Sequence, residues 1–320
     1  MSSSKISKVA IVGAGGNVGS FIASALLKTG KHTITAITRT DSQSKLPNGV
    51  SVAQVDYSSH SSLVYALKGH DALVITLSGH AAIQEIEEKL VRAAGEAGVP
   101  WILPNEWSPD TAHEELVRDV PMFQPKVATR KTIEKLGQSS FISVVTGFWY
   151  EYTLANPGAY GFDLNNQAVT LFDEGKTKVS TSTWPQIGRA VAALLSLPIE
   201  SETEACLDNF RNKVVYVSSF SVDQEDMFAS VLRVTGSKRD GWTVTNEDAQ
   251  GRFDTGFKEM KEGKWSGFGK VMYTRVFFPD GCGDFEHGKG TLNRLLGLPQ
   301  EDIDEATKIA VERAKSPKTH

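Results

Sequence analysis

The chain has 320 residues, of which 40% are hydrophobic and 22% are charged. At roughly 150 residues per domain, this length predicts about two domains with enough apolar material for a large core. A net charge of −4, without a long basic run, argues against nucleic acid or an anionic membrane as a partner.

The two cysteines, Cys206 and Cys282, are too few for a disulfide framework. We expect both to be inert thiols in a reducing compartment. The uncharged stretch over residues 9–27, behind Lys5 and Lys8, superficially resembles a signal peptide. The glycine cluster at its centre would break an apolar helix, so we expect a cytoplasmic protein.

Short apolar runs alternate with helical patterns in the first half of the chain. The predicted strands span residues 8–12, 33–38, 51–55, 72–77, 101–103 and 141–146. Between them, apolar side chains recur at helical spacing, which predicts helices near residues 18–26, 59–69, 83–94 and 127–136. Strands that alternate with helices indicate βαβ units with right-handed crossovers. The sequence therefore predicts an α/β fold with a Rossmann-type, doubly wound parallel sheet.

This alternation changes after about Thr146. Residues 156–158 (Asn-Pro-Gly) predict a turn, and residues 173–176 (Asp-Glu-Gly-Lys) predict the tip of a β-hairpin. A helix over residues 187–197 and a strand over residues 214–218 are expected to return to the main sheet. The remaining residues, rich in Gly, Trp and Phe, predict a second, smaller domain.

The expected domain organisation is therefore discontinuous. Residues 1–155 and about 184–220 form the predicted Rossmann domain, and about 156–183 together with 221–320 form a smaller α/β substrate domain. We expect the active site in the cleft between the two, because ligand sites favour domain junctions.

The strongest signal is a GxxGxxG cluster formed by Gly13, Gly16 and Gly19, between a predicted strand and a predicted helix. Glycine permits a tight turn and lets backbone N–H groups approach a pyrophosphate, which the helix N-terminus also attracts. A turn used only for strand–helix packing is the alternative. The flanking strand and helix favour dinucleotide binding, with Asn17 and Val18 among the expected contacts.

The second predicted strand ends at Arg39, which bears on the type of dinucleotide. An arginine at this position accommodates the 2′-phosphate of NADP, whereas an acidic residue binds the free ribose hydroxyl of NAD. Asp41 follows two residues later, so NAD stays open as the alternative. NADPH is the expected cofactor.

Signatures of other enzyme classes are missing from the sequence. It contains no YxxxK pair of typical short-chain dehydrogenases, no HExxH and no GxSxG. The seven histidines show no metal-ligand spacing, so we expect no metal site.

These residues together resemble a known family. The chain is similar to the NmrA-like branch of atypical short-chain dehydrogenases, and within it to the isoflavone reductase-like enzymes and their fungal relatives. The likeness is strongest over residues 5–155 and looser beyond about residue 220. The matching features are GxxGxxG with Arg39, Gln84, residues 93–99 (AAGEAGV), residues 103–108 (LPNEWS), Lys126 ahead of residues 130–134 (RKTIE), and residues 148–152 (FWYEY). Asn105 and Trp107 replace the Ser and Phe of the plant loop, so we do not transfer plant phenylpropanoid specificity.

The resemblance implies roles for individual residues. Lys126 corresponds to the family's catalytic lysine and would also contact the nicotinamide ribose. A partly desolvated lysine near Arg130 should have its pKa lowered from about 10.4. The remaining expected cofactor contacts are Asp56 and Tyr57 beside the adenine, Thr76, Leu77 and Ser78 at the end of the fourth strand, Asn105 and Phe148.

Four aromatic residues are expected to line the substrate cavity, with core packing at the domain junction as the alternative. They are Trp107, Phe148, Trp149 and Tyr152.

The expected function is NADPH-dependent reduction of a small aromatic or conjugated metabolite, in the setting of secondary metabolism. Hydride would reach a carbonyl, enone or quinone-methide-like carbon, and Lys126 would supply the proton. The alternative is a non-catalytic, dinucleotide-sensing regulatory protein, as found among NmrA-type relatives. The identity of the aromatic substrate, the reaction direction and a homodimer all stay open.

Overall fold

The computed structural model describes residues 5–78 and 83–316. Its largest element is a seven-stranded sheet of order β11-β6-β5-β4-β1-β2-β3, in which all neighbouring strands are parallel. The strands are β1 (Lys8–Val12), β2 (Thr33–Arg39), β3 (Ser51–Val55), β4 (Ala72–Ile75), β5 (Trp101–Leu103), β6 (Ser140–Val145) and β11 (Lys213–Tyr216). The chain adds β2 and β3 on one side of β1 and β4, β5 and β6 on the other, so the strand order reverses between β1 and β4. The predicted Rossmann-type, doubly wound sheet is confirmed.

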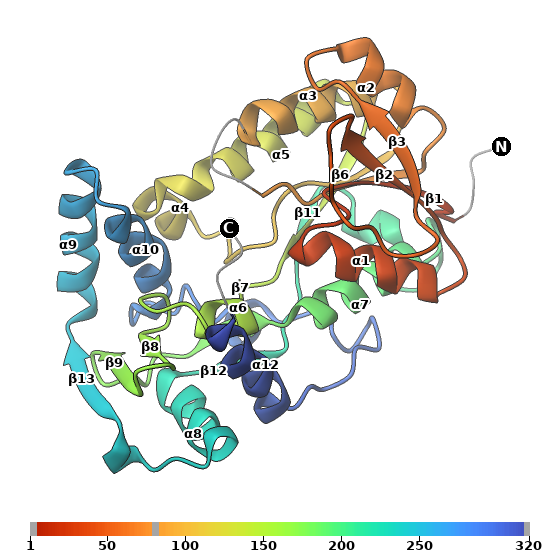
Figure 1. Ribbon diagram of the computed structural model, residues 1–320. Helices are drawn as coiled ribbons and strands as arrows, with labels where there is room; N and C mark the ends of the chain where they lie inside the picture. The colour runs from red at the N-terminus through yellow and green to blue at the C-terminus, as the bar shows by residue number, and fades with distance from the viewer. Residues whose placement is uncertain (1–4, 79–82, 317–320) are drawn as a thin grey trace.

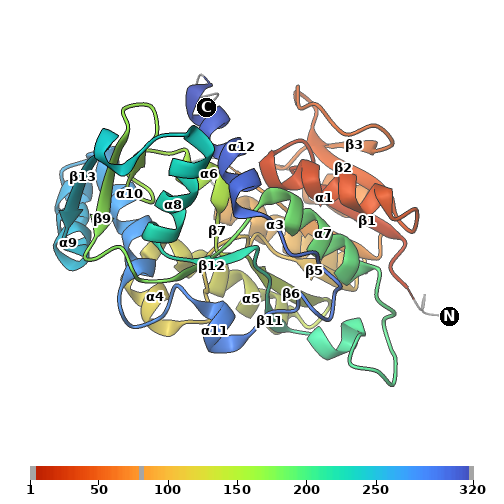
Figure 2. The ribbon, with the colours of Figure 1, turned by 90° about the horizontal axis from the view of Figure 1, so that it is seen from below.

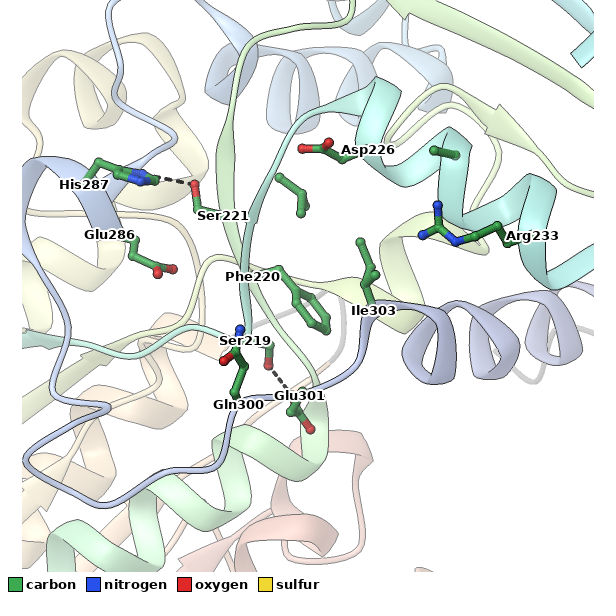
Figure 3. A pocket seen from close by; sticks show the side chains of 12 residues that line it. Ser219, Phe220, Ser221, Asp226, Arg233, Glu286, His287, Gln300, Glu301 and Ile303 are labelled. Atoms are coloured by element: carbon green, nitrogen blue, oxygen red, sulfur yellow. Dashed lines mark hydrogen bonds between the residues drawn. The ribbon is translucent and has the colours of Figure 1, made fainter.

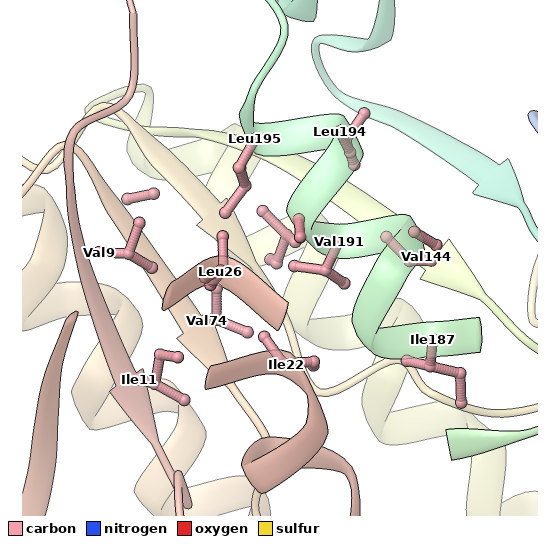
Figure 4. Close-up of a cluster of buried hydrophobic side chains, with 14 of the residues drawn as sticks. Val9, Ile11, Ile22, Leu26, Val74, Val144, Ile187, Val191, Leu194 and Leu195 are labelled. Carbon is pink, nitrogen blue, oxygen red and sulfur yellow. The ribbon is translucent and has the colours of Figure 1, made fainter. Parts of the chain in front are cut away.

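Helices cover both faces of this sheet. One face carries α1 (Asn17–Lys28) and α7 (Trp184–Leu195), which pack against each other. The other carries α2 (His60–Leu67), α3 (Ile83–Glu96) and α5 (Gln124–Leu136). Side chains of β1 alternate between the two cores, because successive residues of a strand point to opposite faces. Val9 and Ile11 join the α1–α7 core in Figure 4, and Ala10 and Val12 join the other.

Local signals fix several helix ends as the sequence predicts. The Ser59 side chain caps α2 by accepting a hydrogen bond from the Ser62 N–H, 3.3 Å away. Gly137 ends α5 in the left-handed conformation, with φ of 63°, which glycine adopts without strain. The predicted helix and strand that return to the main sheet are present as α7 and β11.

The second half of the chain builds two small three-stranded sheets, of order β12-β10-β7 and β13-β9-β8. Their strands are β7 (Phe148–Trp149), β8 (Phe162–Asp163), β9 (Ala168–Phe172), β10 (Val179–Ser182), β12 (Phe220–Val222) and β13 (Thr243–Glu247). The other helices are α4 (Glu114–Asp119), α6 (Tyr150–Leu154), α8 (Gln224–Thr235), α9 (Ala249–Lys261), α10 (Trp265–Thr274), α11 (Phe285–Lys289) and α12 (Ile303–Lys315), with 3₁₀ turns η1 (Pro121–Phe123), η2 (Leu207–Phe210), η3 (Arg239–Gly241) and η4 (Arg275–Phe277).

These later elements gather on one side of the molecule. In Figures 1 and 2, α8, α9, α10 and β13 lie at the end opposite to β1, β2 and β3. They enclose a separate aromatic core, in which Phe228 contacts Phe162 and Trp242 edge to face. The α10 helix is also paired closely with α9. This arrangement places α10 where its side chains reach the candidate site described below.

The hairpin predicted at residues 173–176 is wrong. A turn does occur there, but β9 and β10 on its two sides belong to different sheets. Asp173 adopts a positive φ of 53°, and its carboxylate accepts a hydrogen bond from the Ala249 N–H at the start of α9. The turn after β9 is therefore held against the start of α9 by this hydrogen bond. β9 pairs antiparallel with β8, and β10 pairs antiparallel with β12.

Both cysteines are buried and free, with Cys282 beside the Arg275 guanidinium. Within residues 5–78 and 83–316, no helix combines the length and apolar character needed to cross a membrane.

Candidate active site

The glycine turn after β1 contains two kinds of glycine. The sheet register pairs Val12 with Ile75, so Gly13 and Thr76 leave β1 and β4 side by side. A Cβ on Gly13 would lie 2.3 Å from the Thr76 carbonyl oxygen, and one on Gly19 would lie 2.1 Å from the Gly13 carbonyl oxygen. Gly13 and Gly19 are therefore required for packing. A Cβ on Gly16 meets only the Gly13 carbonyl oxygen, at 3.2 Å.

Gly16 instead leaves open space beside the start of α1, although its own N–H donates to the Gly13 carbonyl at 2.9 Å. It is the N-cap of α1, and no side chain of the described residues accepts a hydrogen bond at this cap. The N–H groups of the first turn of α1, which begins at Asn17, have no partner within the helix. Together with the positive end of the helix dipole they suit a phosphate group. Gly15 faces a different neighbour, because its Cβ would meet Ser44 at 2.8 Å. The glycine turn thus leaves open space beside an uncapped helix start, at the position where the sequence predicts the pyrophosphate.

A cavity of about 150 Å³ opens at this carboxyl edge of the sheet, between β1 and β4. Open α/β sheets bind ligands at such a switch point. The residues that line it are Gly16, Asn17, Val18, Thr76, Leu77, Ser78, Asn105, Trp107, Lys126 and Trp149. Most of the cofactor contacts expected from the sequence therefore lie together here.

A larger cavity of about 460 Å³ adjoins the first, and the two share part of their walls. The shared residues are Asn17, Ser78, Asn105, Trp107, Lys126 and Trp149. All four expected substrate residues line the larger space, together with Met122, Phe123, Phe268, Met272 and Tyr273, which sequence reasoning missed. The cavity is therefore rich in aromatic side chains, and Lys126 lies where it meets the smaller one.

The loop after β5 holds Lys126 in place. The Lys126 ammonium donates hydrogen bonds to the Asn105 and Glu106 carbonyl oxygens, the latter at 2.8 Å. The loop is fixed in turn, because the Asn105 amide donates to the Leu77 carbonyl at 3.1 Å and the Trp107 indole donates to the Ile75 carbonyl at 2.7 Å. Trp107 thus both lines the cavities and ties the loop to β4.

Removal from water lowers the pKa of Lys126, and the nearby Arg130 acts in the same direction. The carboxylates of Glu106 and Glu87 oppose this shift. The net direction agrees with the prediction that Lys126 is a stronger acid than an exposed lysine. Such a group transfers protons more readily near neutral pH.

A buried ion pair stands behind Lys126. The Arg130 guanidinium donates to the Glu106 carboxylate at 2.7 Å and to the Thr111 hydroxyl at 2.6 Å. Its other nitrogen donates to the Thr111 carbonyl at 3.0 Å, and the Thr111 hydroxyl donates to Glu106. The charges of Glu106 and Arg130 are therefore fully paired inside the protein, where an unpaired charge would be costly.

Several expected contacts lie outside these two cavities. Arg39 is exposed at the end of β2, 3.5 Å from Asp41, and β2–β3 pairing sets it opposite Val55. The Asp56 carboxylate accepts bonds from the Ser58 N–H and hydroxyl, at 2.8 and 2.7 Å. Tyr57 packs on the α2–α3 side, and burial raises its pKa to about 12. These residues share the carboxyl edge of the sheet with the glycine turn.

Glu87 is a cavity residue that sequence reasoning missed. It lies on α3, where Ile83, Ile86, Leu90 and Val91 form an apolar stripe, and position 87 falls within that stripe. A charged residue at a buried helical position was the available signal. The neighbouring Gln84 also lines the larger cavity.

Another cavity, of about 560 Å³, lies between β12, α8, α11 and the approach to α12 (Figure 3). Its carboxylates already have partners: Glu301 accepts from the Ser219 hydroxyl, and Glu286 accepts from the Ser218 hydroxyl at 2.6 Å. His287 bonds to Ser221 and Asp284 through the same ring nitrogen, so these three residues do not form a hydrolytic triad.

Residues 5–203 match the model of the NmrA-like family. The chain belongs to the NmrA-like family. The predicted family membership is therefore confirmed. Oxidoreductase aprR of Aspergillus flavus is 29% identical over 305 residues, which cover 93% of this chain and 96% of that protein. An isoflavone reductase homolog of Solanum tuberosum is 31% identical over 196 residues, or 57% of this chain and 62% of that protein.

The solved structures that this NmrA-like chain resembles share its fold. The complex of AtPrR2 with NADP+ and (+)pinoresinol has a TM-score of 0.76 at 21% identity, covering 96% of this chain and 99% of that chain. Isoflavone reductase has a TM-score of 0.74 at 20% identity, covering 94% and 98%. The names of the curated relatives agree with the prediction of an oxidoreductase.

The two kinds of glycine predict opposite outcomes for one substitution. Gly16→Val should abolish NADPH binding while circular dichroism shows a retained fold, because its side chain fills the phosphate cradle. Gly19→Val should destabilise the fold by about 1–3 kcal/mol or more, because its Cβ overlaps the Gly13 carbonyl. If Gly16→Val unfolds like Gly19→Val, the turn serves packing alone.

Proposed function

We propose that this protein is an NADPH-dependent reductase that acts on a small aromatic or conjugated metabolite. The position of Lys126 is the main support for the proposal. Lys126 lines both the cavity of about 150 Å³ beside the glycine turn and the adjoining cavity of about 460 Å³, called the aromatic cavity below. A donor there can reach a substrate and a nicotinamide at once. The names of the relatives, among them an oxidoreductase and an isoflavone reductase homolog, support this activity.

The residues present fit a dinucleotide phosphate. The open space at Gly16 and the N–H groups at the uncapped start of α1 would hold the pyrophosphate. Arg39 would bind the 2′-phosphate, and Thr76, Ser78 and Asn105 would border the nicotinamide half. When bound, NADPH supplies the hydride.

Lys126 donates the proton in this proposal. Hydride addition to a carbonyl, enone or quinone-methide-like carbon leaves negative charge on the substrate oxygen. The carbonyl groups of Asn105 and Glu106 fix the ammonium and leave its third proton for that oxygen. The lowered pKa of Lys126 makes this transfer easier than from an exposed lysine.

The aromatic cavity binds and orients the substrate. Phe148, Trp149 and Tyr152 offer flat apolar surface, and Phe148 also contacts the Tyr273 ring, with centroids 4.5 Å apart. Ligand cavities of this kind are lined by apolar groups with few polar ones. AtPrR2 was solved with the aromatic ligand pinoresinol, which supports an aromatic substrate here.

The experiment pairs NADPH titration by fluorescence with NADPH oxidation measured against a panel of aromatic enones and quinones. Oxidation that depends on a panel compound supports the proposed reductase. Tight NADPH binding without oxidation by any compound would favour the non-catalytic dinucleotide sensor.

Arg39 is expected to set the preference for NADPH over NADH. Arg39→Ala should weaken NADPH binding by about ten- to a hundredfold, the equivalent of one charge-assisted hydrogen bond, and leave NADH binding nearly unchanged. Lys31→Ala is the matched control, because Lys31 precedes the opposite end of the same strand. Equal losses for the two cofactors in titration would refute the phosphate assignment.

A further inference from the structure

Glu87 places a buried carboxyl group in the wall of the aromatic cavity, which adjoins the cavity beside the glycine turn. Its side chain is only 3% exposed, and it comes from α3, whereas Lys126 comes from α5. One carboxyl oxygen accepts a hydrogen bond from the Asn105 N–H at 2.7 Å, and the Thr129 hydroxyl also bonds to this carboxyl. Glu87 therefore faces the same loop and the same cavity as Lys126.

The charges around Lys126 form two sets. Glu106 and Arg130 are paired with each other, and Thr111 completes their hydrogen bonds. Glu87 and Lys126 remain. They lie on either side of one residue, because Lys126 bonds to the Asn105 carbonyl and Glu87 to the Asn105 N–H. Both also line the cavity, where water can connect groups that do not touch directly.

We propose that Glu87 is the proton reservoir of Lys126 and returns a proton to it in each turnover. This inference rests on the proposed reductase function. The Lys126 ammonium gives one proton to the substrate oxygen and becomes a neutral amine. The protonated Glu87 carboxyl then gives its proton to that amine through the cavity, becomes a carboxylate, and regains a proton from solvent. Glu87 acts through Lys126.

The electrostatics of the site agree with this role. Burial raises the pKa of Glu87, and the nearby Glu106 carboxylate raises it further. The Asn105 N–H, the Lys126 ammonium and the Thr129 hydroxyl act in the opposite direction. The Glu87 pKa therefore rises while the Lys126 pKa falls, which brings the two groups closer in proton affinity.

The first test needs no substrate. Infrared difference spectra over a pH titration should show a protonated carboxyl that titrates above the usual glutamate range, and Glu87→Gln should remove this band. Lys126→Met should move its midpoint to higher pH, because the ammonium stabilises the Glu87 carboxylate. Glu88→Gln is the control: Glu88 is the next residue on α3, is exposed and pairs with Arg92. A missing band, or a midpoint unmoved by Lys126→Met, would overturn the proposal.

The second test uses the panel enone or quinone that the wild type reduces fastest. Glu87→Gln keeps an acceptor for the Asn105 N–H, and its amide group can bond to the Thr129 hydroxyl in place of the carboxyl, so a purely structural role would leave turnover intact. We expect kcat to fall about ten- to a hundredfold with KM nearly unchanged. The alkaline limb of kcat should also move to lower pH, because the Glu87 carboxylate raises the Lys126 pKa.

Wild-type kcat and an unmoved pH profile in Glu87→Gln would exclude the reservoir. If Lys126→Ala is inactive at the same time, the proposed reductase function stands and only the role of Glu87 falls. If Lys126→Ala retains wild-type turnover, the proton-donor assignment fails first.

Discussion

Lys126→Ala is expected to lower turnover at least about a hundredfold while changing NADPH affinity by less than about tenfold. The loss follows because the ammonium held by the Asn105 and Glu106 carbonyls is the donor aimed at the developing oxyanion. Lys126→Arg should not restore activity, because a guanidinium retains its proton. Steady-state kinetics and fluorescence titration on the same preparations measure both effects.

Lys131→Ala provides the control for this prediction, because Lys131 is exposed on the same helix. The wild-type pH profile gives an independent check. A proton donor is active only when protonated, so kcat falls as pH rises through the Lys126 pKa. Because that pKa is lowered from 10.5, the alkaline limb should begin below the range of a free lysine. Wild-type turnover in Lys126→Ala would require another proton source.

Arg130→Met is expected to destabilise the fold by about 3–5 kcal/mol, the largest stability effect that we predict. It would leave the Glu106 carboxylate, 1% exposed, without its charged partner. Thr111 would also lose the guanidinium that bonds to its hydroxyl and its carbonyl. Urea unfolding monitored by circular dichroism measures the change in the free energy of unfolding.

Two further variants give this prediction its controls. Arg92→Met removes an exposed ion pair of similar geometry and should cost less than about 1 kcal/mol. The double variant Arg130→Met with Glu106→Gln should recover part of the loss, since no unpaired charge is left in the interior. A loss in Arg130→Met as small as in Arg92→Met would show that Glu106 finds water or another partner.

The sequence predicts the parallel sheet well because its signals are local. β1, β4, β5 and β6 are short apolar runs, β2 and β3 alternate polar and apolar residues, and glycine or a capping serine marks the turns between them. The carboxyl ends of parallel strands must meet at one edge, so Thr76, Asn105 and the glycine turn are predictable as neighbours before any coordinates exist.

The second half was harder to predict because its contacts are not local. The turn at Asp173 has the composition of a hairpin tip, yet its carboxylate bonds to Ala249, far along the chain. Phe268 and Tyr273 reach the cavity from α10, and no sequence pattern predicts that α10 lies near Lys126. The sequence shows Glu87 as an acidic residue within an apolar helical stripe. It does not show that Glu87 bonds to Asn105, which lies on a different element. The division of the chain into two discontinuous domains stays a prediction.

The most direct test of the reductase function follows the hydride. NADPH deuterated at C4 of the dihydronicotinamide, in each of its two stereoisomers, is incubated with the protein and the panel of aromatic enones and quinones. We predict that mass spectrometry finds deuterium on carbon in a reduced product, from one of the two isomers only, and that Lys126→Ala abolishes the label. Saturable NADPH binding with neither deuterium in an enone product nor NADPH oxidation by a quinone, whose reduction leaves no deuterium on carbon, would contradict the reductase and indicate a protein that binds the dinucleotide without using it.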